Sequence, residues 1–328
     1  MERFITALPK AELHLHLEGS VEPDLLRELG KRNGLHTAGW ELAAFERVYQ
    51  YEDFSGFLQA FKFVSQHLKT PADYEAVTCD LARKLAGQKV SYAEVILSVG
   101  VLLWLGRELE PYFEAVTRGA EAGERDHGVK FYWIFDATRQ FGIEPAREVA
   151  RLAARYREQR VVAFGIGGDE AQAPPELFRD VFRAAREEGL HCVAHAGEAA
   201  GPESVRAAVE LLGAERIGHG LRAASDPSLL ELLADRQIPL EVCLSSNVAT
   251  GVLDRVGNHP LPQFLAAGVP VVLNTDDPAM FRTDLNREYR LAAGTFGLAE
   301  EQLSEMARNS FRFAFEKNLP GGRAEEGG

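Results

Sequence analysis

The chain has 328 residues, and 46% of them are hydrophobic, which is enough to fill a large core. It carries 36 Lys and Arg against 49 Asp and Glu, a formal net charge of −13 at pH 7. This balance argues against a nucleic-acid partner or an anionic membrane surface, because such binding depends on clustered basic side chains. Three cysteines without a CxxC pair, no signal-like N-terminus and no apolar run of about 18 residues predict a reduced, soluble, cytoplasmic protein.

Short apolar runs bounded by glycine, proline or charge predict a series of strands. In chain order these are Glu12–Leu17, Val90–Leu97, Val129–Asp136, Val161–Gly167, His191–Ala196, Arg216–Gly220, Pro239–Leu244 and Pro270–Thr275. Helix-period segments lie between most of them, for example Arg147–Arg157, Glu176–Glu188, Pro202–Leu212, Pro227–Asp235 and Pro260–Ala267. The repeated alternation predicts a (β/α)8 TIM barrel, and a doubly wound parallel sheet is the alternative that periodicity alone does not exclude.

The interval between the first two predicted strands is much longer than the others and contains an apolar, aromatic helical stretch, Phe54–Leu68. In a barrel, this helical insertion after strand 1 would lie on the C-terminal face, where it could cover a pocket. An ordinary extra helical layer is the equally weighted alternative. We expect residues 1–318 to form one barrel domain, and residues 319–328 to form a disordered tail because they offer little to bury.

Polar and glycine residues gather where the predicted strands end, although strands of a buried parallel sheet are otherwise apolar. They are His14 and His16 in the first strand, Gly168 and Asp169 after the fourth, His195 and Glu198 at the fifth, His219 at the sixth, and Asp276 and Asp277 after the eighth. Because the C-terminal ends of barrel strands converge on one face, we expect these groups to meet there.

Three neutral imidazoles with one carboxylate match the ligand preferences of zinc. A catalytic zinc also needs a proton donor or acceptor nearby, and Glu198 and His219 are available. Arg139, after the third strand, could bind an anion in the pocket or pair with a local carboxylate. We expect the remaining histidines to be surface residues and not ligands: His36, His67, His127, His191 and His259. We expect Cys192 and Cys243 to be inert buried thiols.

In order along the chain, the motifs LPKAELHLHLEGS, GIGGDE, HAGE, ERIGHG, SSN and NTDDP resemble those of the adenosine deaminase family of the amidohydrolase superfamily. The matches extend from residue 8 to about residue 316. HxH alone is a weak signal, whereas HxH, HAGE, GHG and TDDP in this order are specific. The resemblance implies that residues 1–318 form a zinc-dependent hydrolase barrel that removes the 6-amino group of a purine.

The resemblance also implies the metal ligands by position, which are His14, His16, His195 and Asp276. Binuclear amidohydrolases usually bridge their metals through a carboxylated lysine on the fourth strand, and VVAFGIGG has no lysine. We therefore expect one Zn²⁺ per chain. A zinc deaminase of the cytidine type is excluded, because its PCxxC ligand motif is absent.

The resemblance further implies the roles of five residues in catalysis and substrate binding. Glu198 would protonate the purine nitrogen N1, and His219 would orient the attacking hydroxide or act as base. Asp276 would also accept a proton from the zinc-bound water, whose pKa falls from about 15.7 to about 7. Asp277 would hydrogen-bond N7, and the backbone N–H of Gly168 would meet N3.

The motifs indicate the identity of the substrate less clearly. Adenosine-specific members of the family usually carry an Asp that receives the ribose 5′-hydroxyl, and this chain has Glu18 at that position. Adenine deaminases tend to carry Glu there, but their fourth strand usually reads like LDSSE rather than GIGGDE. A purine nucleoside altered at its 5′ position reconciles both observations. The resemblance then implies 6-aminodeoxyfutalosine, a menaquinone precursor bearing a carboxylate that Arg139 could meet.

Adenosine is the next candidate and adenine the third. A silent metal- or purine-binding homologue and an amidohydrolase for a non-purine C–N bond are the other classes. Retention of every ligand position and of Glu198 argues against the silent homologue. The oligomeric state stays open.

Overall fold

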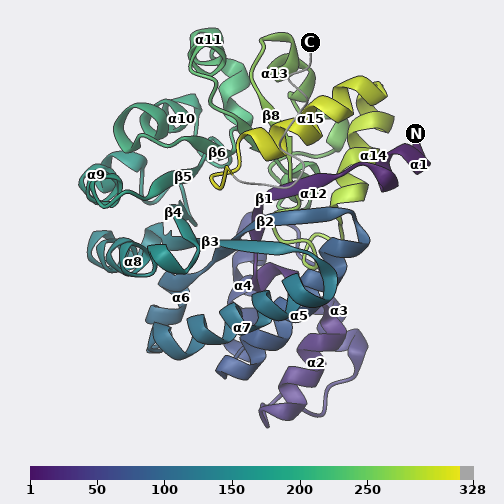
Figure 1. The fold of residues 1–328 in the computed structure, drawn as a ribbon, viewed down its shortest axis with the longest axis vertical. Helices are drawn as coiled ribbons and strands as arrows, with labels where there is room; N and C mark the ends of the chain where they lie inside the picture. The colour runs from purple at the N-terminus through teal and green to yellow at the C-terminus, as the bar shows by residue number, and fades with distance from the viewer. Residues whose placement is uncertain (318–328) are drawn as a thin grey trace.

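The computed structural model describes residues 1–317, so the predicted tail of residues 319–328 lies outside the described residues. Within the described residues, eight parallel strands follow one another in space in chain order (Figure 1). They are β1 (Lys10–His16), β2 (Val90–Leu97), β3 (Lys130–Thr138), β4 (Val161–Gly167), β5 (His191–Ala196), β6 (Arg216–His219), β7 (Leu240–Val242) and β8 (Val271–Leu273).

The last strand returns to the first, which makes the sheet a barrel. An isolated parallel bridge joins Leu15 to Asp276. The His16 N–H donates to the Asp276 carbonyl at 2.8 Å, and the Asp276 N–H donates to the His14 carbonyl at 3.0 Å. The predicted TIM barrel is therefore confirmed, and the doubly wound alternative is excluded because its sheet would have two free edges.

Helices surround the barrel and connect successive strands (Figure 1). They are α1 (Glu2–Ala7), α2 (Pro23–Arg32), α3 (Leu42–Val48), α4 (Phe54–His67), α5 (Pro71–Gly87), α6 (Val99–Trp104), α7 (Leu109–His127), α8 (Ile143–Arg155), α9 (Arg179–Glu187), α10 (Pro202–Ala207), α11 (Pro227–Asp235), α12 (Leu244–Ala249), α13 (Leu261–Ala266), α14 (Leu285–Phe296) and α15 (Glu300–Arg312). None of the helices in residues 1–317 is long and apolar enough to cross a membrane.

The predicted elements are all present, with their ends shifted by a few residues. The predicted seventh strand, Pro239–Leu244, is shortened to β7 because α12 begins at Leu244. The predicted helix Pro202–Leu212 changes from α10 to a π-helical turn at Ala208. These differences arise where a strand runs directly into a helix or where one helical geometry gives way to another.

The long insertion after β1 has two parts. Helices α2 and α3 project away from the barrel at the bottom of Figure 1. Helix α4 begins at the N-cap Asp53, whose side chain accepts the Gly56 N–H, and its residues line a cavity at the C-terminal end of the barrel. The predicted helix Phe54–Leu68 therefore covers a pocket, whereas α2 and α3 form the extra helical layer.

The barrel interior contains a buried ion network below the C-terminal face. Arg216 lies between Glu94 and Glu241, with nitrogen–oxygen distances of 2.6 Å to each. All three side chains are at most 3% exposed. The guanidinium also donates to the Phe313 carbonyl and lies 3.9 Å from the Phe315 ring centroid. The segment after α15 is thereby joined to the barrel interior.

We predict that Arg216→Met strongly destabilises the protein, because it leaves two buried carboxylates without their cation. Removing one partner of a buried ion pair costs about 3–5 kcal/mol. Arg151→Met is the control, because the Arg151–Glu148 pair is exposed and such pairs contribute at most about 1 kcal/mol. Urea unfolding measures both variants. Equal, small losses in the two would contradict the importance of the buried network.

Candidate active site

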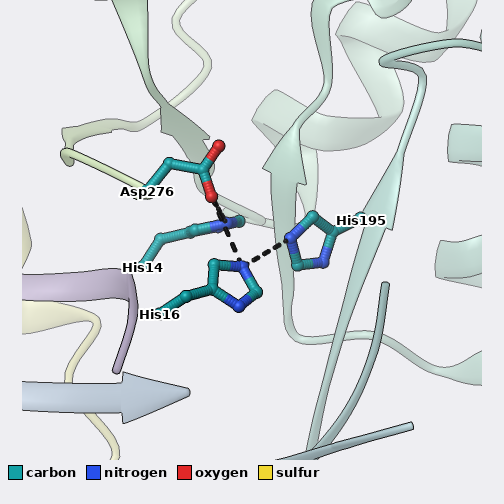
Figure 2. Close-up of side chains that lie close together, drawn as sticks. All are labelled: His14, His16, His195 and Asp276. Atoms are coloured by element: carbon teal, nitrogen blue, oxygen red, sulfur yellow. Dashed lines mark hydrogen bonds and ion pairs between the residues drawn. The ribbon is translucent and has the colours of Figure 1, made fainter. Parts of the chain in front are cut away.

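Three histidines and one aspartate from β1, β5 and the turn after β8 converge at the C-terminal end of the barrel (Figure 2). One ligand atom from each of His14, His16, His195 and Asp276 lies within 4.8 Å of the others. His16 Nε2 is 3.2 Å from His195 Nε2 and 3.3 Å from Asp276 Oδ1. His14 Nε2 is 3.4 Å from the same carboxylate oxygen. The predicted ligand set is thus brought together.

This arrangement fits a single metal ion. Nitrogen and oxygen ligands about 2.0–2.1 Å from a tetrahedral zinc stand about 3.3 Å from one another. The separations of 3.2 to 3.4 Å match that spacing. His14 Nε2 is also buried without a hydrogen-bond partner, which is the condition of a ligand atom facing a metal position.

Neighbouring groups fix the orientation of the ligands. His14 Nδ1 is 2.8 Å from the Glu241 carboxylate, and His195 Nδ1 is 3.2 Å from the Ile166 carbonyl. Asp276 Oδ2 accepts the hydroxyl of Ser246 at 2.7 Å. Partners of this kind select the histidine tautomer and hold Nε2 toward the metal position.

Two of the site residues have a left-handed backbone that is uncommon outside glycine. His219 and Asp276 both have φ of +64°. Such conformations cost on the order of 1–3 kcal/mol and persist where surrounding contacts impose them. At Asp276 the constraint is the pair of backbone hydrogen bonds to β1. His219 ends β6 and Asp276 lies in the turn after β8, and both line the cavity at the end of the barrel.

His219 and Glu198 lie beside the cluster rather than in it. His219 Nε2 is 3.6 Å from Glu198 Oε2 and 3.8 Å from Asp276 Oδ2. Its Nδ1 is 3.3 Å from the Asn247 amide nitrogen. When Nδ1 accepts from that amide, the neutral ring carries its proton on Nε2, facing the two carboxyl groups.

The carboxyl groups of the site divide into ionised and protonated ones. Burial and the nearby Asp276 charge raise the pKa of Glu198 to about 8. Burial and the same neighbour raise the pKa of Asp277 well above its usual range. Burial opposes the ionisation of Asp276, but the close contact with His14 and the other nearby imidazoles hold its pKa well below its usual range. One carboxylate is therefore ionised between two carboxylic acids.

The imidazoles also differ in protonation. Burial lowers the pKa values of His16 and His219 to about 4, and that of His195 falls well below its usual value. Burial opposes the charging of His14, yet its close contacts with the Asp276 and Glu241 carboxylates raise its pKa to about 10. A metal ion bound here must displace the second proton of His14, so binding is coupled to proton release.

A cavity of about 330 Å³ opens from this cluster. Its walls come from α4, α6 and the 3-10 turn Arg139–Phe141, with the strand ends forming the floor. Asp277 and Gly168 line it, as predicted for groups that face a ligand. A Cβ at Gly19 would overlap the Asp277 carboxyl, so the glycine of the HLHLEGS motif leaves space for that side chain.

Glu18 and Arg139 are not among the residues that line the cavity. Glu18 is buried, its Oε1 accepts the Ser98 N–H at 3.3 Å, and it is Ser98 that faces the cavity. Burial raises the pKa of Glu18 to about 7. Arg139 is fully buried and donates to the carbonyls of Ala173 and His195. Its guanidinium therefore supports the end of β5 behind the cavity wall.

Two of the histidines predicted at the surface are buried, which corrects that interpretation. His67 is 2% exposed, because its ring nitrogens meet the Thr37 hydroxyl and the Phe63 carbonyl within the insertion. His259 is 3% exposed, and one of its nitrogens accepts the Leu261 N–H. The predicted burial of Cys192 and Cys243 is confirmed.

Sequence reasoning missed Glu170, although it ends the GIGGDE motif. Its carboxylate accepts the N–H groups of four consecutive residues, Gly197 to Ala200, and the Ser204 hydroxyl. This fixes the backbone that carries Glu198. Glu241 and Asp136 were also missed: Glu241 supports His14, and Asp136 lines the cavity with a pKa that burial raises to about 8. The signal that could have identified Glu241 and Asp136 is a carboxylate within an otherwise apolar strand.

Comparisons with known proteins agree with this architecture. The profile of the adenosine deaminase family matches residues 9–319. An aminodeoxyfutalosine deaminase from Streptomyces coelicolor is 40% identical over 96% of this chain and 82% of its own length. An adenine deaminase from the same organism is 37% identical over 94% of this chain and 90% of its own length.

Two solved structures share the fold. The adenine deaminase from Arthrobacter aurescens superposes with a TM-score of 0.90 at 30% identity, covering 95% of each chain. An amidohydrolase from Burkholderia ambifaria with bound zinc has a TM-score of 0.89 at 27% identity, covering 97% of this chain and 88% of that one. Because the family profile spans nearly the whole chain and the relatives align over most of their lengths, the protein belongs to the adenosine deaminase family.

Proposed function

We propose that this protein is a zinc-dependent hydrolytic deaminase with one Zn²⁺ per chain. It converts the 6-amino group of a 6-aminopurine nucleoside to a 6-oxo group and releases ammonia. The observation that carries the proposal is that the Glu198 carboxyl group lines the same cavity as a four-residue cluster spaced for a metal. Acid chemistry and a metal position in one enclosed site are the requirements for hydrolysis of an aromatic C–N bond.

His14, His16, His195 and Asp276 would hold the ion, a proposal supported by their spacing and by the zinc in the similar amidohydrolase. A bound zinc supplies an activated water at neutral pH, because it lowers the pKa of that water to about 7. Asp276 is held ionised and can accept a proton. His219, 3.8 Å from Asp276 and 3.6 Å from Glu198, orients the nucleophile between them.

Glu198 acts as the general acid. Attack at C6 interrupts the aromaticity of the purine, so N1 must gain a proton as the tetrahedral centre forms. The raised pKa of Glu198 keeps that proton on its carboxyl group at neutral pH. Asp277 is protonated for the same reason and can donate to N7, a hydrogen-bond acceptor. The Gly168 N–H would meet N3, and both residues line the cavity.

We infer that the substrate is 6-aminodeoxyfutalosine, which would place the enzyme in menaquinone synthesis. Support comes from Glu18 in place of the usual aspartate and from the 40% identity to an aminodeoxyfutalosine deaminase. Glu18 would act on the sugar end through Ser98, and Arg139 would position the end of β5 that carries His195. Deamination of adenine is the second candidate, because an adenine deaminase is 37% identical. Adenosine is the third.

The values of kcat/KM on 6-aminodeoxyfutalosine, adenosine and adenine, measured with the zinc-loaded enzyme, test the substrate. We expect the highest value on 6-aminodeoxyfutalosine. Equal or better turnover of adenine or adenosine would reject the substrate assignment but keep the deaminase. Metal-loaded protein that converts none of the three would reject the proposed reaction and favour a binding protein.

We predict that Glu198→Gln lowers kcat about 10²–10⁴-fold, the usual contribution of a general acid, and leaves the metal content unchanged. In the unmodified enzyme, the acid form of Glu198 exists below its pKa, so activity falls as the pH rises through about 8. That alkaline limb should vanish in the variant. Glu231→Gln, on the outer helix α11, is the control. Full activity of the Glu198 variant would contradict the assigned role.

We predict that Glu241→Gln weakens metal binding about 10–100-fold, the usual effect of losing a carboxylate behind a histidine ligand. Competition with a chelator, followed by metal analysis, measures this change. Glu215→Gln is the matched control, because Glu215 contacts His191, a histidine outside the cluster, at 2.9 Å. In the unmodified enzyme and in Glu215→Gln, binding should weaken as the pH falls below about 10, where His14 without metal takes up its second proton. Equal metal retention in the two variants would argue against this position for the ion.

A further inference from the structure

The outer end of the cavity has its own chemistry, which the proposed deamination does not use. Helix α4 places Phe61 against His16, with 6.2 Å between ring centroids, so this part of the helix reaches the metal cluster. The next residue, Lys62, is exposed and also lines the cavity. Trp104, on the opposite wall, is 49% exposed. Lys62 and Trp104 therefore mark the mouth.

The mouth is formed by a cation held over a pair of stacked aromatic rings. Lys62 Nζ lies 5.1 Å from the centroid of the Trp104 ring. The Trp104 and Phe141 rings stack at 5.6 Å with an interplanar angle of 11°. These residues come from α4, α6 and the turn Arg139–Phe141, three segments that meet at this rim. An exposed tryptophan stacked in this way offers a flat apolar surface to a ligand.

Acidic and basic side chains lie at opposite ends of the cavity. Its inner end carries four carboxyl groups, those of Asp136, Glu198, Asp276 and Asp277. Among the described residues that line the cavity, Lys62 is the only lysine or arginine, and no carboxylate of residues 1–317 forms an ion pair with it. The chain as a whole has a net charge of −13 and repels anions. A free cation at the mouth thus provides a local position where an anionic group is attracted.

We propose that Lys62 and the Trp104–Phe141 stack form a subsite for a carboxylate on the part of the substrate remote from the purine. The inference rests on the proposed function and names the residues that select a 5′-modified, carboxylate-bearing nucleoside. The inner carboxyl groups receive the purine, and Lys62, the only lysine or arginine among the described lining residues, holds the anion of the substrate at the mouth. Lys62 takes the role that Arg139 cannot fill, because the Arg139 guanidinium is held by backbone carbonyls.

The test compares Lys62→Met with the unmodified enzyme on 6-aminodeoxyfutalosine, on adenosine and on adenosine 5′-monophosphate. Methionine keeps the length of the side chain and removes only the charge. We expect the ratio of kcat/KM for 6-aminodeoxyfutalosine to that for adenosine to fall about tenfold or more, as for the loss of one charged hydrogen bond. The change should appear in KM. Lys62→Arg should restore the ratio, and Lys31→Met, an exposed lysine of α2 outside the cavity, should leave it unchanged.

A direct binding measurement gives a second readout. Tryptophan fluorescence should be quenched by the 6-oxo product of 6-aminodeoxyfutalosine, and added salt should weaken that binding in the unmodified enzyme more than in Lys62→Met. Trp104→Leu should remove the quenching.

The outcomes of these measurements distinguish failure of the subsite from failure of the proposed function. If the unmodified enzyme converts none of the nucleosides, the proposed function itself fails. If it converts 6-aminodeoxyfutalosine and Lys62→Met keeps the same ratio and affinity, the subsite is rejected while the function stands. A loss confined to adenosine 5′-monophosphate would make the anion a phosphate and would overturn the carboxylate assignment.

Discussion

The closure of the barrel at Asp276 is the constraint on which the rest of the structure depends. The residue joins β8 to β1 through two backbone hydrogen bonds, to His14 and His16. Its side chain meets the same two histidines at 3.3 to 3.4 Å. The seam of the barrel and the candidate metal centre are therefore one feature. A shift in the β1–β8 register would open the sheet and separate the ligands together.

Charged side chains are buried near the junction of β1 and β8. They are arranged so that each acidic side chain lies next to a basic one or a histidine. The network runs from Glu94 through Arg216 and Glu241 to His14 and Asp276. Each anion contacts a cation or a histidine, so no charge in the network is buried alone. The same burial keeps protons on Glu198 and Asp277, where the attraction of a nearby cation is weaker than the cost of desolvation. The neighbours of a buried carboxyl group therefore decide whether it belongs to the ion network or has a raised pKa.

The barrel supplies the inner end of the cavity, and the insertion supplies the outer end. Strand ends are rigid and hold groups at fixed distances, which suits a metal cluster and a general acid. Helix α4 brings apolar and cationic side chains across the opening and contacts the cluster through Phe61. Reaction chemistry and substrate choice can thus reside on different segments, a division that the (β/α)8 architecture makes possible through its loops.

The sequence predicted the eight strands and the gathering of histidines and carboxyl groups at their ends, because strand–helix alternation and strand-end residues are local patterns. The four metal ligands were implied by the resemblance to the adenosine deaminase family, and the pairing of Leu15 with Asp276 was needed to tell the closed barrel from a doubly wound sheet. The sequence also predicted the helix Phe54–Leu68, but left open whether that helix covered a pocket. The packing of loops and helices over the barrel placed Arg139 and Glu18 behind the cavity wall and Lys62 opposite Trp104, and no local pattern indicated either result. Glu170 and Glu241 likewise gained their positions from contacts between distant segments. The physical reason is that spacing along a strand fixes which side a residue takes, whereas burial and partners depend on how loops and helices pack over the barrel.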